Sequence, residues 1–325
     1  MNRWTAIKVA AAIVATAVAM YFVLSQVSVD DLEALPHRID PAYLALAFGL
    51  YLTANVARAL RYRVLLGKRI GTARLLQVVF TQNFFNSFLP LRAGEVSYLV
   101  MVHQSGTVKP GANLASLVGA RLLDFLAALL IPLAALPLTA AWDHPEHSVR
   151  GLAAIAAGAA GAIALFAALA IWQSARLARW LERRGERGEG RWHRGLRHLA
   201  DAVRALAELR SGRVLLPVLA LSFGCWLLLY LASATILHGA GLPISTADGV
   251  FVNGLPSLVS MTPLYMFGGF GLFEGTVVFG LTLVGVPTEQ AVSTSLLAHV
   301  AELSMIILPA LPMPLVAAYR ARRAA

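Results

Sequence analysis

The sequence predicts an all-α polytopic membrane protein with six full spans and two re-entrant or broken helical hairpins in an inverted repeat. Hydrophobic residues make up 58% of the chain, and the mean hydropathy is +0.69. The apolar residues occur in runs long enough to cross a bilayer, which takes about 20 residues in a helix. Basic residues cluster between these runs, as expected of membrane proteins. We therefore treat residues 1–325 as a single transmembrane domain.

Six segments reach the length of a full span: Trp4 to Leu24, Pro41 to Leu66, Ala112 to Ala141, Arg150 to Trp172, Val214 to Leu237 and Gln290 to Ala317. The first is expected to be an uncleaved anchor, because no small-residue cleavage site follows it. Two further apolar regions, Leu75 to Met101 and Val250 to Val284, contain prolines and glycines in their middle. Broken backbone at membrane depth is tolerated only inside protein or beside a wet cavity, so each region predicts a hairpin or a discontinuous helix.

The basic residues indicate the orientation of the chain. If each broken region enters and leaves on the same side, five segments share one side: the N-terminus, 58–74, 106–110, 176–213 and the C-terminus. These segments contain 23 of the 27 Lys and Arg residues. The positive-inside rule therefore places them, and both termini, on the cytoplasmic side of a bacterial or archaeal inner membrane. Arg92 and Arg121 are expected at membrane depth. Because the charge of +10 is explained in this way, we expect no nucleic-acid partner.

Residues 173–213 form a predicted basic cytoplasmic loop. Its stretch "RHLADAVRALAELR" repeats apolar residues with helical spacing, and the four positions are Leu196, Leu199, Val203 and Leu206. This pattern predicts a helix lying on the inner leaflet, beside a basic connector that holds anionic lipid head groups weakly. A loop that only sets orientation is the alternative.

An internal repeat relates residues of about 72–140 to about 246–318. Pro90 precedes Glu95, which Gly106 follows eleven residues later, and Pro263 precedes Glu274, which Gly285 follows eleven residues later. The helices that come next contain "ARLLD" and "AHVAE", each with a proline beyond. Under the topology above the two copies face opposite ways, which is typical of transporters with alternating access.

The motifs "NSFLPLRAGEV", "ARLLD" and "GGFGLFEG" occur in this order along the chain. Together they resemble the transmembrane region of lysylphosphatidylglycerol synthetases and the stand-alone flippase-like proteins related to it, over about Pro41 to Leu315. The resemblance implies lipid translocation, or a supporting role in making and exporting modified lipids or polyprenyl-linked sugars. It also makes a homodimer plausible. No aminoacyl-transferase domain is seen after Ala325, so a separate lipid synthase is an expected partner.

Arg92 is the first candidate for a lipid phosphate ligand, because a buried guanidinium makes paired, charge-assisted hydrogen bonds to phosphate. Helix N-termini near Gly94 and Gly271 would add backbone donors, and a glycine allows a head group to come close. The structural alternatives are an Arg92–Glu95 ion pair that pins the hairpin, and favourable placement of Glu95 and Glu274 in a first helical turn.

Two pairs on later spans share a helix face, Arg121 with Asp124 and His299 with Glu302. They are either self-contained pairs or partners that bridge to Glu274 and Arg92. Proton coupling through Glu95, Glu274, Asp124 or His299 is also open. Neutral polar residues of the broken regions, Asn86 among them, either contact the head group or bond across helices.

No Walker motif is present, and "GGFGLFEG" fails the dinucleotide fingerprint, so we expect no cofactor and no direct use of ATP. The loop "WDHPEH" lacks a third His or Cys, so no metal site is expected. The leading hypothesis is a lipid flippase-like transporter without catalytic residues. The alternatives are an intramembrane transferase with Glu95 or His299 as base, and a non-catalytic partner of a lipid synthase.

Overall fold

A computed structural model describes residues 38–89, 93–142, 149–186, 190, 196, 199–201, 203–204, 212–260 and 269–313. Within these ranges the chain is helical and has no β-strand, which confirms the predicted all-α class. The α-helices are α3 (Pro41–Leu65), α4 (Thr72–Phe88), α5 (Ala93–His103), α6 (Pro110–Ala135), α7 (Val149–Gly185), α9 (Gly212–Gly239), α10 (Thr246–Ser260), α11 (Leu272–Leu283) and α12 (Thr288–Ala310). Short 3-10 turns, η2 (Leu136–Leu138) and η3 (Ala140–Trp142), follow α6.

Local sequence accounts for several helix ends. The Asp40 carboxylate accepts a hydrogen bond of 2.8 Å from the backbone N–H of Ala42, and Pro41 supplies the first turn of α3 without leaving a donor unsatisfied. At the end of α4, Leu89 is extended, with φ −105° and ψ 144°. The following Pro90 explains this conformation, because proline disfavours helical backbone in the residue before it.

Four segments are long and apolar enough to cross a membrane: Pro41–Leu65, Pro110–Leu138, Gly212–Gly239 and Thr288–Ala310. They correspond to four of the six predicted spans. The predicted span from Trp4 to Leu24 lies outside the described residues, and the span from Arg150 to Trp172 lies within α7. The chain is thus a polytopic membrane protein, while the count of six spans stays a prediction.

Helix α7 extends beyond the predicted span. It contains 37 residues, or about 55 Å at 1.5 Å per residue, so the start of the predicted basic loop at residue 173 is helical instead. Residues 196–204, as far as they are described, pack their apolar side chains against this extension: Leu196, Ala200 and Val203 contact Ala178 and Leu181. Contact with the inner leaflet stays a prediction for this segment, and part of its apolar face is already covered by protein.

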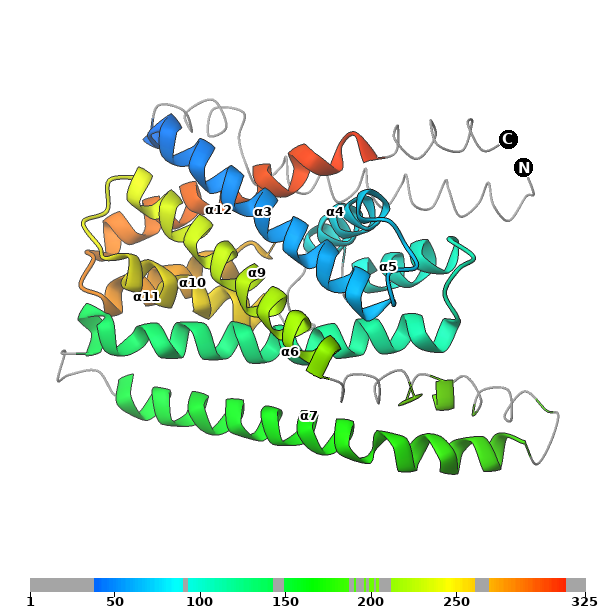
Figure 1. Cartoon of the computed structure of the whole chain (residues 1–325). Coiled ribbons are helices and arrows are strands. Elements are labelled where there is room, and N and C mark those ends of the chain that lie inside the picture. The colour runs from blue at the N-terminus through cyan, green and yellow to red at the C-terminus, as the bar shows by residue number, and fades with distance from the viewer. Residues whose placement is uncertain are drawn as a thin grey trace.

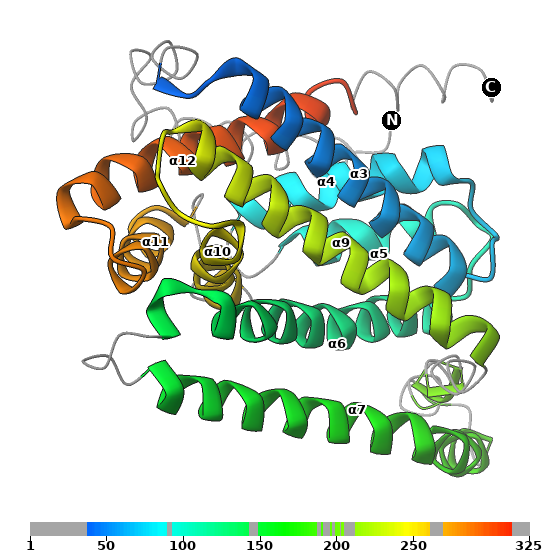
Figure 2. The same cartoon turned by 60° about the vertical axis from the view of Figure 1, so that its left-hand side comes forward.

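The long helices lie side by side in alternating directions (Figures 1 and 2). Helices α3 and α9 cross the front as an antiparallel pair, and the backbone N–H of Asp40 bonds to the carbonyl oxygen of Gly239 at 3.1 Å. Their contact is close at Gly239, where an added Cβ would lie 2.6 Å from the Cβ of Tyr43. Helix α7 packs on α6 at the edge of the bundle.

The two broken regions form helix pairs at opposite ends of the bundle. Helices α4 and α5 lie where α3 ends and α6 begins, whereas α10 and α11 lie where α9 ends and α12 begins (Figures 1 and 2). In addition, α4 packs against α12 while α10 packs against α6. This reciprocal arrangement is the one that an inverted repeat requires; the repeat boundaries at 72–140 and 246–318 stay predictions.

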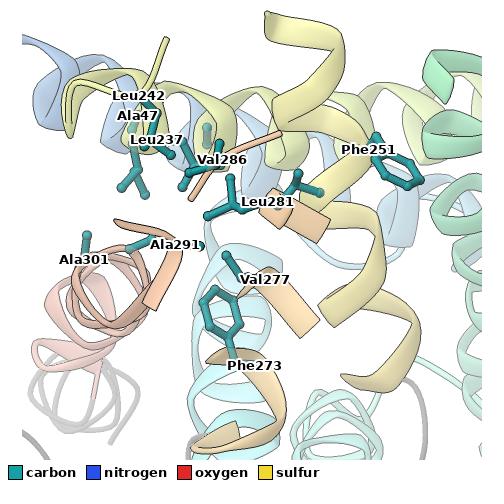
Figure 3. Packing of buried hydrophobic residues seen from close by; sticks show 14 of the residues in the cluster. Ala47, Leu237, Leu242, Phe251, Phe273, Val277, Leu281, Val286, Ala291 and Ala301 are labelled. Atoms are coloured by element: carbon teal, nitrogen blue, oxygen red, sulfur yellow. The ribbon is translucent and has the colours of Figure 1, made fainter. Parts of the chain in front are cut away.

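The largest apolar core holds the second pair in place. Phe273, Val277 and Leu281 repeat every four residues along α11 and turn toward neighbouring helices (Figure 3). They meet side chains of α3, α9, α10 and α12, including Ala47, Leu237 and Ala301. One face of α11, the helix that follows the second break, is buried in protein in this way.

Candidate functional site

A polar cavity lies inside the bundle and has a volume of about 230 Å³. Residues of α3, α4, α6, α9, α10 and α12 contribute to its wall. Its charged lining residues are Arg58, Arg121 and Glu302. The other lining residues are Tyr51, Asn83, Asn86, Ser87, Trp226, Leu229, Tyr230, Ala232, Ser233, Ile236, Ser257, Met305 and Ile306. Charged side chains inside an apolar bundle are costly and mark functional sites.

Beside the cavity, Arg61 of α3 and Asp124 of α6 form a buried ion pair. Their side chains are 0% and 2% exposed, and Arg61 Nη1 lies 2.5 Å from Asp124 Oδ1. Arg61 Nη2 also donates to Asp124 Oδ2 at 3.2 Å, which makes the pair bidentate. Trp226 of α9 donates its indole N–H to Asp124 Oδ1 at 2.8 Å, and Ser222 accepts from Arg61 at 3.1 Å. The pair therefore ties three long helices together.

Arg121 connects this pair to the first broken region. Its Nε lies 2.9 Å from Glu95 Oε1 on α5, and its Nη1 donates to Asp124 Oδ2 at 3.4 Å. The predicted pairing of Arg121 with Asp124 along α6 is thus present, but the closer carboxylate belongs to Glu95. The Arg121 and Glu95 side chains are 20% and 27% exposed, so this contact reaches the cavity and is not sealed in the core.

The sequence analysis was wrong about Arg58 and Arg61, which it assigned to the basic cytoplasmic segment 58–74. Both lie within α3, where Arg61 is buried and Arg58 lines the cavity. The physical reason is that acceptors on other helices, Asp124 for Arg61 and Asn83 for Arg58, draw the side chains inward. A signal was present, because both positions fall inside the predicted span from Pro41 to Leu66.

Glu302 and His299 of α12 make contacts with other helices. Glu302 lines the cavity, and its Oε1 accepts a hydrogen bond of 2.5 Å from the hydroxyl of Ser233 on α9. His299 is 1% exposed, and its Nδ1 lies 2.6 Å from Glu274 Oε1 on α11. The bridge from His299 to Glu274 is the alternative that the sequence analysis left open beside a self-contained His299–Glu302 pair.

A second cluster forms around this bridge at the start of α11. Phe270 and Phe273 lie against the His299 ring, with ring centroids 4.6 and 4.3 Å away. The backbone N–H of Gly271 donates to Glu274 Oε2 at 2.7 Å, and Gly271 has φ +81°, which favours glycine. The N–H that was expected to face a head group is therefore satisfied by Glu274. None of these residues lines the polar cavity.

The remaining predicted site residues belong to the first broken region. Gly94 packs against α4: an added Cβ would lie 2.1 Å from the carbonyl oxygen of Gln82 and 2.5 Å from Asn86 Oδ1. Atoms of α4 thus occupy the space beside Gly94 in which a lipid head group had been expected. Asn86 itself lines the cavity. Arg92, the first candidate for a phosphate ligand, lies outside the described residues, and its role stays a prediction.

The cavity offers guanidinium, carboxylate, amide and hydroxyl groups, all of which can form hydrogen bonds to a polar head group. No group of three or more metal-binding side chains occurs in the part of the chain that the structure describes. The Asp143–His147 loop lies outside that part.

A family model described as the lysylphosphatidylglycerol synthase TM region matches residues 7–310. No curated protein and no solved structure matches the chain.

Proposed function

The chain belongs to the family of the lysylphosphatidylglycerol synthase transmembrane region, and from this premise we propose that it moves a lipid between membrane leaflets. The family indicates a membrane protein related to lipid metabolism or transport. The proposed substrate is an anionic or phosphate-containing lipid, of the aminoacyl-phosphatidylglycerol or polyprenyl-phosphate sugar type. The proposed location is the bacterial or archaeal inner membrane.

The polar cavity is the observation that carries this proposal. A bundle with only a structural role gains nothing from charged side chains at its centre, since each costs free energy in an apolar setting. Here Arg58, Arg121 and Glu302 surround about 230 Å³ of space. That volume is smaller than most pockets for drug-sized ligands. It suits a head group, while the acyl chains remain in the bilayer.

The two helix pairs supply a means of alternating access. Helix α4 contributes Asn86 and Ser87 to the cavity wall, and α10 contributes Ser257. Because the pairs lie at opposite ends of the bundle, movement of one pair opens the cavity toward one leaflet and movement of the other pair opens it toward the second. The Arg121–Glu95 contact between α6 and α5 would then form and break as the first pair moves.

The test is a leaflet-exchange assay in reconstituted vesicles with a panel of labelled lipids. We expect the wild type to move at least one phosphate-containing lipid faster than protein-free vesicles. Ser87→Phe should slow that lipid by about tenfold or more, because the ring fills part of the cavity. Thr53→Phe adds the same ring on an exposed face of α3 and should leave the rate unchanged.

Two results would contradict the proposal. One is a wild-type rate no faster than that of empty vesicles for every lipid in the panel. The other is a chemically altered lipid by mass spectrometry, which would instead favour the transferase hypothesis.

A further inference from the structure

Among the described residues, three arginines lie in or beside the polar cavity, and they differ in which groups lie next to their charges. Arg61 forms the bidentate pair with Asp124. Arg121 lies 2.9 Å from Glu95 and 3.4 Å from Asp124. Each of these two guanidiniums therefore has a carboxylate within ion-pair distance, which offsets the cost of burying its charge.

Arg58 has no such carboxylate among the described residues. Its one hydrogen bond there runs from Nη1 to the side-chain oxygen of Asn83, at 2.7 Å. Its Nε is buried without a partner in the same part of the chain. Arg61 Nε is unpartnered too. Arg58 therefore differs from Arg61 in that no carboxylate of the described residues lies within ion-pair distance of it. A guanidinium that faces a cavity without a carboxylate within 4.0 Å can attract an anion to that cavity.

Glu302 is the other charged group of the wall that forms no salt bridge to a described residue. It lies on α12, and its carboxylate accepts the hydroxyl hydrogen of Ser233 on α9. No ion pair of 4.0 Å or less joins it to Arg58 among the described residues. The two groups therefore face the cavity as separate positive and negative positions.

The surroundings of Arg58 fix the direction of its guanidinium. Arginine only donates hydrogen bonds, so Asn83 must present its oxygen to Arg58 and its amide hydrogens elsewhere. Those hydrogens go to Asn55 Oδ1 at 2.7 Å and to the Tyr51 hydroxyl at 3.3 Å. Asn55 in turn donates to the carbonyl oxygen of Tyr51 at 2.8 Å. This chain of neutral groups orients Arg58 but contributes no countercharge.

We propose that Arg58, held by Asn83, binds the phosphate group of the transported lipid. The second terminal nitrogen, Nη2, makes no hydrogen bond within the described ranges, so it can donate to a phosphate oxygen. This assignment rests on the proposed function, because it supplies the contact that holds the substrate in the cavity. It is independent of Arg92, which lies outside the described residues.

The test compares a variant that removes the charge of Arg58 with a variant that places a carboxylate beside it. Arg58→Gln deletes the cation. Asn83→Asp keeps the cation and places a carboxylate where the amide oxygen now lies 2.7 Å away. A phosphate site should lose affinity in both variants, by about tenfold or more. If Arg58 serves only the fold, Asn83→Asp should stabilise the protein and leave lipid binding unchanged. Arg74→Gln, which removes an arginine bonded to Gln77 and absent from the cavity wall, is the matched control.

The measurement is the thermal unfolding of the purified full chain in detergent, titrated with phosphatidylglycerol in one series and with inorganic phosphate in another. We expect the wild type and Arg74→Gln to be stabilised, and Arg58→Gln and Asn83→Asp to need about tenfold more probe for the same shift. Stabilisation by phosphatidylglycerol alone identifies a lipid head group; stabilisation by both probes identifies phosphate itself. Equal titrations for all four proteins, or no response of the wild type to either probe, would overturn the assignment.

Leaflet exchange with the same variants separates this inference from the proposed function. If Arg58→Gln and Asn83→Asp move lipid at the wild-type rate, the site is wrong and the function stands. If the wild type moves no lipid but shows binding that depends on Arg58, the function is wrong and the site stands.

Discussion

Arg61 and Asp124 show how a single residue pair can decide whether a membrane bundle folds. Their charges are removed from both lipid and water, and their mutual contact, together with Arg121, Trp226 and Ser222, compensates that burial. Breaking such a pair costs about 3–5 kcal/mol, because it leaves one charge buried alone, whereas replacing both charges is often nearly neutral.

We therefore expect Asp124→Asn to destabilise the protein by about 3–5 kcal/mol. The amide can still accept the Trp226 N–H, so the loss reflects the uncompensated charge of Arg61. Thermal unfolding in detergent, together with the fraction of monodisperse protein on gel filtration, measures the effect.

The control for this change is the double variant Arg61→Met with Asp124→Asn. It removes both charges while keeping an acceptor for Trp226, so it should recover most of the lost stability. A double variant as unstable as Asp124→Asn alone would show that the hydrogen bonds of this pair, and not its charge balance, hold α3 to α6.

At the scale of elements, the two glycines that lie next to the repeated glutamates differ in how closely another helix approaches them. Gly94 precedes Glu95 on α5, and Gly275 follows Glu274 on α11. At Gly94 an added Cβ would lie 2.1 Å from the backbone of α4, whereas nothing lies within 4 Å of one at Gly275. The first pair is therefore packed backbone to backbone at Gly94, whereas exposed Gly275 contacts no other helix.

This difference predicts opposite results for two alanine substitutions. Gly94→Ala should push α5 away from α4, disturb the nearby Glu95–Arg121 contact and lower the unfolding temperature by several degrees, since overpacking commonly costs 1–3 kcal/mol. Gly275→Ala should be neutral or stabilise by up to about 1 kcal/mol, because alanine favours helix. Thermal unfolding of both variants provides the check; a tolerated Gly94→Ala would mean that the α4–α5 contact is looser than the structure shows.

At the scale of the whole molecule, we expect the opposed helix pairs to place two turns on opposite sides of the membrane. The turn from α5 to α6 contains exposed Thr107, and exposed Gln290 lies in the first turn of α12. The α5–α6 turn and the start of α12 lie at opposite ends of the bundle (Figures 1 and 2). By the positive-inside rule, the end of the bundle that contains Thr107 is expected to face the cytoplasm.

Single cysteines in a Cys225→Ala background test this arrangement. Cys225 is the only cysteine of the chain and is buried, so its removal leaves one reporter thiol in each variant. We expect a membrane-impermeant maleimide added to intact cells, with the outer membrane opened where there is one, to label Gln290→Cys. Thr107→Cys should react only after the inner membrane is opened. Labelling of both positions from the same side would rule out the opposed entry of the two helix pairs.

Prediction from sequence succeeded where the signal is local in the chain. The runs of apolar residues gave the all-α membrane class, and Pro90 and the segment from Pro263 to Gly271 lie between α4 and α5 and between α10 and α11. Gly94 and Pro256 were also expected to break the helices, but they lie inside α5 and α10. The family resemblance is confirmed by the match over residues 7–310. The resemblance between the two broken regions also directed attention to Glu95, Arg121 and Glu302, which the structure places in or next to the cavity wall.

Prediction failed where the answer depends on distant partners. Counting charges at span ends cannot distinguish an arginine at the head groups from one turned into the bundle. Arg61 is buried because Asp124, 63 positions further along the chain, approaches it from α6. Glu274 and Gly271 were expected at the same cavity as Arg121, but packing around His299 holds them in a separate cluster.

The sequence by itself determined that the chain inserts into a membrane as broken and unbroken helices, because hydrophobic length and proline or glycine breaks act on each segment independently. Tertiary structure alone decided which charges are neutralised and which face the cavity. Ion pairing requires contacts of a few ångströms between helices far apart in sequence, and only the packed bundle brings Arg61 to Asp124 while leaving Arg58 beside neutral Asn83.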